Sequence, residues 1–162
     1  MSGVFVSVGS MMPFDRLTRA MDEWAAANPG IPVEIQIGKG EYEPRHAKWV
    51  RKLALPDYQA RVAGCALFVA HCGMGSIISA IEAGKPILML PRLQAMGEHN
   101  TDHQLATAKH VGIRPGLHVA ADADDLKART SALLADTGTA PAPISRFADP
   151  EFTARIRAFI ES

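Results

Sequence analysis

The sequence predicts one α/β domain built on a doubly wound, mostly parallel sheet. Short apolar segments alternate with amphipathic helical segments along most of the 162 residues, and this alternation is typical of parallel sheets covered by helices. Two apolar runs, Ala66–Ala70 and Ile87–Leu90, contain no polar residue, as expected of strands buried on both faces. A glycine turn follows each of two predicted strands, at the position where such sheets bind ligands.

The N-terminal segments alternate between strand and helix. Val4–Val8 is a short apolar strand that Gly9-Ser10 ends. A helix is predicted from about Phe14 to Ala27, because apolar residues recur there at helical spacing opposite charged ones. Residues 28–30 (Asn-Pro-Gly) end this helix. Residues Ile31–Ile37 then alternate apolar with polar side chains, which indicates a second strand.

A basic segment and a short helix come next. The basic residues of the segment are Arg45, His46, Lys48, Arg51 and Lys52. We interpret this segment as a short, partly exposed strand, with a face for a partner or a membrane as the alternatives. A helix is then predicted from Leu55 to Gly64, since Pro56 suits the first turn of a helix and glycine its end.

The centre of the chain, Ala66–Pro91, is predicted to fold as strand, glycine turn, helix and strand. His71 follows the first apolar run, Gly73 and Gly75 form the turn, and Ser76 opens the helical segment. Glycines let the backbone approach a ligand closely, and a helix N-terminus presents unpaired N–H groups with a positive dipole end. This combination suits a phosphate or a diphosphate. A tight turn whose glycines serve only packing is the alternative, and the turn alone does not decide between them.

The second apolar run leads into a polar loop and a predicted helix from about Asp102 to Val111. Five side chains concentrate there: Glu98, His99, Asp102, His103 and Gln104. Carboxylate, amide and imidazole groups together can hydrogen-bond the adjacent hydroxyls of a sugar. Metal binding is disfavoured because the order of acid and histidine is not H-E-x-x-H and no third ligand is evident. The lack of a G-x-S-x-G motif disfavours a serine nucleophile, and a plain helix N-terminus with solvated histidines is the simplest alternative.

The C-terminal third predicts a last strand and two more helices. The strand is expected at His118–Ala120, and Asp122 is expected to cap a helix that continues to about Ala135. We therefore predict a nucleotide-sugar-binding domain over residues 1–135 and a Pro/Gly/Thr-containing linker over residues 136–148. Residues 149–162 are expected to form an amphipathic helix that docks on its own domain or on a partner.

Composition excludes several classes of protein. The formal net charge is zero and the pI is about 7.0, so the sequence has no electrostatic footprint for nucleic acid or an anionic membrane. The apolar runs are too short to cross a bilayer, and we see no export signal at the start. Cys65 and Cys72 form no C-x-x-C pair, so we expect reduced thiols in a cytoplasmic protein and assign neither a catalytic role.

Four motifs resemble the C-terminal, donor-binding domain of family 28 glycosyltransferases. They are V-x-V-G-S at Val6–Ser10, A-H-x-G-x-G-S at Ala70–Ser76, G-K-P at Gly84–Pro86 and P-R-x4-G-E-H-x2-D-H-Q at Pro91–Gln104. The resemblance implies the Rossmann-like C-terminal half of a two-domain GT-B fold. It extends from Val4 to about Val111 and is strongest to the small soluble subunit of split, two-part enzymes, such as the dolichol-linked GlcNAc transferase and bacterial exopolysaccharide or capsule counterparts.

The resemblance also implies roles for individual residues. The implied catalytic residues are His71, Glu98 and His99. The residues implied to bind the diphosphate are Gly9, Ser10, Gly73, Gly75 and Ser76, together with His71, and those implied at the donor sugar are Asp102, His103 and Gln104. The related enzymes usually place an acidic residue at the position of Ser79 to bind the ribose. Glu82, about one helical turn further along, is the nearest acid here.

The implied activity is transfer of a sugar from a nucleoside diphosphate, most simply UDP, to a lipid-linked acceptor in polysaccharide synthesis. No cofactor and no essential metal are expected. A membrane-anchored partner subunit would supply the acceptor site and hold the protein at the inner face of the membrane, and no nucleic acid is involved. The alternatives are a non-catalytic nucleotide-sugar-binding regulatory protein, a nucleotide-sugar epimerase and, with least support, a small phosphohydrolase.

Overall fold

The computed structural model describes residues 3–136, 140–142 and 149–161 and contains a parallel sheet of six strands in the order β3-β2-β1-β4-β5-β6. The strands are β1 (Val4–Ser7), β2 (Val33–Gln36), β3 (Lys48–Val50), β4 (Leu67–His71), β5 (Ile87–Leu90) and β6 (Leu117–Val119). Every pairing between neighbouring strands is parallel. The sheet therefore confirms the doubly wound α/β class predicted from the alternating apolar segments.

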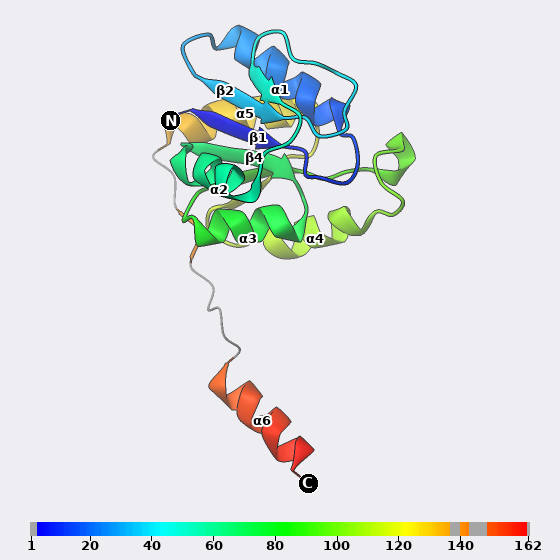
Figure 1. Cartoon of the computed structure of the whole chain (residues 1–162), viewed down its shortest axis with the longest axis vertical. Coiled ribbons are helices and arrows are strands. Elements are labelled where there is room, and N and C mark those ends of the chain that lie inside the picture. Colours follow the sequence, from blue (N-terminus) through cyan, green and yellow to red (C-terminus); the bar gives the residue numbers. More distant parts are fainter. Residues whose placement is uncertain (1–2, 137–139, 143–148, 162) are drawn as a thin grey trace.

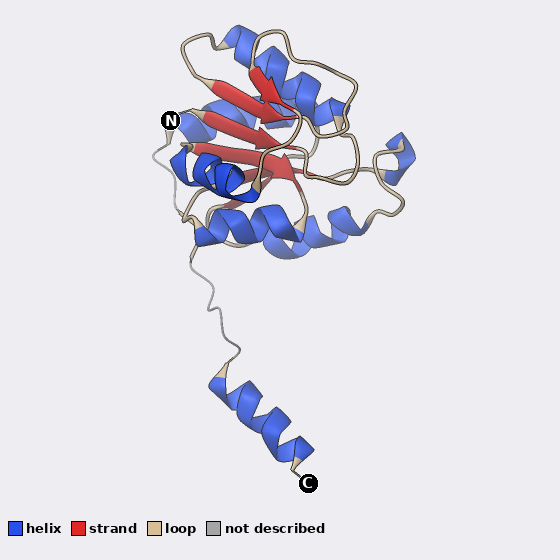
Figure 2. Cartoon of the chain, viewed as in Figure 1, coloured by secondary structure: helices blue, strands red, loops and turns tan. Residues whose placement is uncertain are grey.

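Helices cover both faces of the sheet, as Figures 1 and 2 show. They are α1 (Asp15–Ala27), α2 (Leu55–Gly64), α3 (Met74–Glu82), α4 (His103–Val111) and α5 (Ala123–Ala135), with a short 3-10 turn, η1, at Gln94–Met96. Helices α1 and α5 pack with the sheet around one apolar core. Helices α2, α3 and α4 pack around the other core. Strands β1 and β4 are buried along nearly their whole length because both cores contain their side chains.

Most predicted boundaries agree with the structure to within about two residues. Strand β5 and helix α2 have the predicted bounds, and Asp122 caps α5 by accepting the backbone N–H groups of Asp124 and Asp125 at 3.0 and 2.8 Å. Helix α3 begins at Met74 rather than Ser76, because Gly73 serves as its N-cap residue. Turn η1 was not predicted, since a single turn of three residues leaves no periodic pattern.

The strand order reverses between β1 and β4. Chain connections from β1 lead outward to β2 and β3, whereas connections from β4 lead outward to β5 and β6. The loops after β1 and β4 consequently separate and leave space at the carboxyl ends of these two strands, where open α/β sheets bind ligands. Both predicted glycine turns follow these two strands.

Helix α6 (Pro150–Ile160) begins at the predicted place, with the Asp149 side chain accepting the backbone N–H groups of Glu151 and Phe152. Every described residue from 149 to 161 is exposed (Figure 1), and docking of α6 on its own domain or on a partner stays a prediction. The predicted linker, residues 136–148, lies mostly outside the described residues. Within the described part of the chain, no helix combines the length and apolar character needed to span a bilayer.

Asp22 of α1 anchors the segment that leads into β3. Its buried carboxylate accepts four hydrogen bonds of 2.7–2.9 Å, from the hydroxyl of Tyr42 and the backbone N–H groups of Arg45, His46 and Ala47. Burial alone would raise the pKa of Asp22, but these donors outweigh burial and lower the pKa below its usual value of 3.8. The charged carboxylate therefore stabilises the fold above that pH.

We expect Asp22→Ala to lower the free energy of unfolding by about 2–4 kcal/mol, because it leaves buried N–H groups without acceptors. The neighbouring change Glu23→Ala removes only an exposed contact with Lys127 and should cost at most about 1 kcal/mol. In wild type, stability should fall as the pH drops below about 3.8 and Asp22 becomes protonated. Urea titrations across pH measure both effects, and equal stabilities for the two variants would contradict the anchoring role.

Candidate functional site

A cleft of about 760 Å³ lies at the carboxyl ends of β1 and β4. Segments that follow β1, β3, β4 and β5 line it. Ten of the predicted site residues line this cleft: Gly9, Ser10, His71, Gly73, Gly75, Ser76, Ser79, His99, His103 and Gln104. The structure thus brings together both glycine turns and most of the polar segment after β5.

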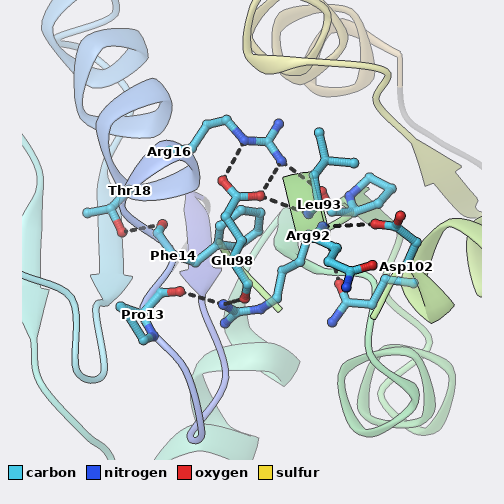
Figure 3. A network of polar contacts seen from close by, with 11 residues as sticks. Pro13, Phe14, Arg16, Thr18, Arg92, Leu93, Glu98 and Asp102 are labelled. Atoms are coloured by element: carbon cyan, nitrogen blue, oxygen red, sulfur yellow. Dashed lines mark hydrogen bonds and ion pairs between the residues drawn. The ribbon is translucent and has the colours of Figure 1, made fainter. Parts of the chain in front are cut away.

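Three predicted site residues do not line the cleft: Glu82, Glu98 and Asp102. The carboxylate of Glu98 pairs with the Arg16 guanidinium through two contacts of 2.8 Å and also accepts the backbone N–H of Leu93 at 3.0 Å. Asp102 accepts the backbone N–H of Gln94 at 2.8 Å. These two carboxylates therefore fix the loop after β5 (Figure 3). Glu98 was predicted to be catalytic and Asp102 to bind the sugar, but neither lines the cleft.

The imidazole of His71 lies between the two glycine turns. A Cβ atom built on Gly9 would lie 2.7 Å from Cε1 of His71, and one built on Gly73 would overlap Nε2 of the same ring. Gly9 also has a φ of 83°, which favours glycine. The Nδ1 atom of His71 is buried and has no hydrogen-bond partner among the described residues. The ring therefore packs tightly between the two glycines.

Gly75 is different, because a Cβ built there would meet nothing within 4 Å. Gly75 lies in the first turn of α3 and lines the cleft. No side chain caps the N-terminus of α3, so its first backbone N–H groups and the positive end of its dipole are available to a ligand. The two glycines of this turn thus differ in their surroundings: Gly73 adjoins the His71 ring, whereas Gly75 faces open space.

His71 is neutral at physiological pH. Burial, with a smaller contribution from the positive charge of Arg92, lowers the pKa of His71 from 6.5 to about 4. A neutral imidazole presents one donor and one acceptor. At His71, an anion in the cleft is therefore met by a neutral imidazole and not by an imidazolium.

The lowered pKa of His71 predicts a dependence of stability on pH. The unfolded chain binds a proton on this histidine below about pH 6.5 and the folded chain only below about 4, so stability decreases as the pH falls through this window. We expect a loss of about 2 kcal/mol between pH 7 and pH 5 from this group. His118 also has a lowered pKa, because of burial and the nearby Arg129. The measurement is therefore the difference in the free energy of unfolding between wild type and His71→Gln as a function of pH. Identical pH profiles for the two proteins would contradict the contribution of His71.

The far side of the cleft carries the histidine pair of the loop and helix after β5. The rings of His99 and His103 meet edge to face with centroids 4.4 Å apart. Thr101 contacts both, through its backbone N–H to His99 Nδ1 at 3.2 Å and its hydroxyl to His103 Nδ1 at 2.7 Å. Across the part of the chain that the structure describes, no three His, Cys, Asp or Glu side chains gather in an arrangement that could hold a metal ion.

Sequence reasoning missed Arg92 and Arg16. Arg92 follows β5 directly, is only 3% exposed and lines the cleft. Burial lowers its pKa to about 10, against the opposing effect of Glu98, so it stays charged at neutral pH. A cation placed directly after a fully apolar strand was the available signal for Arg92. Arg16 gave no such signal, because a charge on the polar side of a helix is ordinary.

Both cysteines lie in the apolar core that packs against α2 and α3, and neither lines the cleft. Cys65 and Cys72 are each 1% exposed. Burial raises the pKa of Cys65 and raises that of Cys72 to about 11. Thiolates are therefore scarce at both positions at neutral pH.

An open parallel sheet with a cleft at its switch point is the arrangement of a nucleotide-binding α/β domain. The family model described as the glycosyltransferase family 28 C-terminal domain matches residues 3–145. This chain therefore belongs to that family of donor-binding glycosyltransferase domains.

Solved structures with the same fold are GT-B glycosyltransferases. The glycotransferase of kitacinnamycin superposes with a TM-score of 0.60 at 21% identity, over 83% of this chain and 35% of that one. A UDP-glucose: anthocyanidin 3-O-glucosyltransferase in complex with UDP superposes with a TM-score of 0.59 at 14% identity, over 83% of this chain and 32% of that one. Os79 from O. sativa in complex with UDP superposes with a TM-score of 0.59 at 17% identity, over 98% of this chain and 35% of that one. This chain thus spans about a third of their length. Among curated protein sequences, no match is found.

Proposed function

We propose that this chain binds the donor in a glycosyltransferase that moves a sugar from a UDP-sugar to a lipid-linked acceptor in polysaccharide synthesis. One observation carries the proposal: both glycine turns, the uncapped N-terminus of α3 and the segment after β5 line a single cleft. Family membership supports the donor-binding role, and two of the similar structures are described as complexes with UDP.

The proposed placement follows the order of the strands. The diphosphate would lie at the N-terminus of α3, where N–H groups and the dipole favour the charge that gathers on it as the glycosidic bond breaks. The sugar would lie toward His99, His103 and Gln104, which follow β5. The nucleobase would lie toward Leu53 and Tyr58, which follow β3 and give this end of the cleft an apolar lining. No step of this proposal uses a metal ion or another cofactor.

The acceptor site is proposed to come from a membrane-anchored partner subunit, which would hold this protein at the inner face of the membrane. Helix α6 supports the existence of a partner surface, because its apolar side chains are exposed: Phe152 is 54% and Ile156 45% exposed. Burying such side chains against another chain would stabilise the complex. We expect the chain alone to bind donor and to transfer little or no sugar.

Calorimetry with UDP, GDP and a panel of UDP-sugars tests donor binding. We expect UDP and at least one UDP-sugar to bind more tightly than GDP, and no binding of any nucleoside diphosphate would end the proposal. Coexpression with the partner subunit then tests the split arrangement. Robust transfer by the isolated chain would contradict that arrangement while leaving donor binding intact.

A non-catalytic nucleotide-sugar-binding regulatory protein is the second candidate. Ser79 favours it, because this residue stands where related enzymes carry an acid for the ribose. Its hydroxyl donates to the carbonyl of Gly75 at 2.8 Å, and Glu82 does not line the cleft. Donor binding without transfer in the presence of the partner and acceptor would favour this candidate.

A further inference from the structure

The loop between β1 and α1, residues 8–14, carries the first glycine turn but little hydrogen bonding of its own. The N–H of Gly9 donates to the hydroxyl of Ser7 at 3.2 Å. Among the described residues, no backbone-to-backbone hydrogen bond involves residues 9–13. Met11 is 80% exposed. A loop with so few internal bonds adopts one conformation only if other parts of the molecule hold it.

Arg92 supplies the hydrogen bonds that hold this loop. Its guanidinium donates to four backbone carbonyls, of Val8 at 2.7 Å, Met12 at 2.8 Å, Glu98 at 3.2 Å and Pro13. Three of these carbonyls belong to the loop that carries Gly9. The guanidinium also lies over the ring of Phe14, 4.6 Å from its centroid. Figure 3 shows Arg92 reaching from the end of β5 to Pro13.

The hydrogen bonds of Arg92 indicate that it acts on the loop rather than directly on a ligand. A guanidinium has four N–H donors on its two terminal nitrogens, and the four carbonyls occupy them. Carbonyl groups bonded in this way are fixed in direction, since a planar fork tolerates little rotation. Arg92 therefore acts on the cleft through the loop.

Glu98 and Arg16 extend the same network to the start of α1. The backbone carbonyl of Glu98 accepts from Arg92, while its carboxylate holds Arg16 of α1 and the N–H of Leu93. Arg16 also donates to the carbonyl of Pro91 at 2.8 Å. The loop after β1, the loop after β5 and the start of α1 are thus joined by partly buried, charge-assisted bonds.

We propose that Arg92 is a positioning residue that holds the first glycine turn in the conformation that receives the diphosphate. The inference rests on the proposed function for the identity of the ligand, and on the four carbonyl bonds for the role of Arg92. When a loop is already held in its binding conformation, ligand binding does not have to supply the free energy of ordering it, and the affinity is higher. Loss of Arg92 should therefore weaken binding even though its terminal nitrogens donate to backbone carbonyls of the protein.

Arg92→Lys and Arg92→Met separate positioning from charge. Lysine keeps the positive charge but cannot reach four carbonyls from one nitrogen, whereas methionine keeps only part of the length and no charge. We expect both variants to bind UDP at least tenfold more weakly than wild type by calorimetry. Arg129→Met, which removes an arginine paired with Asp125 on the surface of α5, is the matched control and should bind as wild type does.

A spin label reports on the loop without any ligand. Met11→Cys provides an exposed attachment site, and the two native cysteines are buried. We expect a nitroxide at residue 11 to be ordered with Arg92 present and more mobile with Lys or Met at residue 92. The label therefore measures loop order independently of UDP binding.

The outcomes are distinct. Wild-type affinity in Arg92→Lys would overturn the inference by assigning the effect to charge, and loss of cooperative unfolding in both variants would overturn it by showing that Arg92 holds the whole domain. If wild type binds no UDP, the proposed function fails. The spin label then decides the inference, and an unchanged spectrum in both variants overturns it.

Discussion

Gly75→Ala is expected to weaken UDP binding at least tenfold while leaving the protein as stable as wild type or slightly more stable. The added methyl group meets no protein atom within 4 Å and occupies the cleft where the diphosphate is proposed to meet the N-terminus of α3. Alanine in place of glycine within a helix favours folding by up to about 1 kcal/mol. Calorimetry with UDP and thermal unfolding measure the two effects separately.

Gly30→Ala is the matched control for this change. Gly30 also has nothing within 4 Å of an added Cβ, and it lies in the turn before β2, away from the residues that line the cleft. We expect Gly30→Ala to leave UDP binding unchanged. Unchanged binding in Gly75→Ala would place the diphosphate somewhere other than the N-terminus of α3.

Gly73→Ala should have the opposite profile, with a loss of stability of about 1–3 kcal/mol from overpacking. The new methyl group would overlap the ring of His71, and the ring cannot retreat because Gly9 closes its other side. The backbone of Gly73 itself tolerates alanine, with φ −108° and ψ 142°. The cost therefore comes from the contact with the imidazole.

A double-mutant cycle with His71→Ala tests this explanation. Removing the ring makes room for the methyl group, so the double variant should be more stable than the sum of the two single changes predicts. We expect a coupling of about 0.5–3 kcal/mol in denaturant titrations. Additive effects would show that Gly73 is required for some reason other than the imidazole.

Local sequence patterns were sufficient for the fold and for the position of the cleft. Apolar runs without polar residues predicted β4 and β5, and a glycine after each of β1 and β4 predicted where a ligand could approach. These signals work because they depend on neighbouring residues and on one general property of parallel sheets, the space at a switch point. The roles of the residues within the cleft stay predictions.

The contacts that fix the loops could not be predicted in the same way. Glu98 pairs with Arg16, which lies 82 residues earlier in the chain, and Arg92 reaches carbonyls about 80 residues away. Backbone carbonyls leave no trace in a sequence, since every residue has one. The predicted catalytic role of Glu98 came from the resemblance alone, because nothing in the sequence shows that Glu98 pairs with Arg16. In the structure its carboxylate makes this pair and does not line the cleft.

The two buried thiols provide a built-in reporter of opening on the side of the domain that α2 and α3 cover. Cys65 and Cys72 lie in the core beneath α2 and α3, and both are protected by burial and by raised pKa values. A thiol reagent can modify them only when this side of the domain opens. The rate of alkylation therefore measures how often this side of the domain opens. Cys72 lies between His71 and Gly73, which both line the cleft, so a nucleotide that stabilises the closed domain should slow its alkylation as occupancy rises.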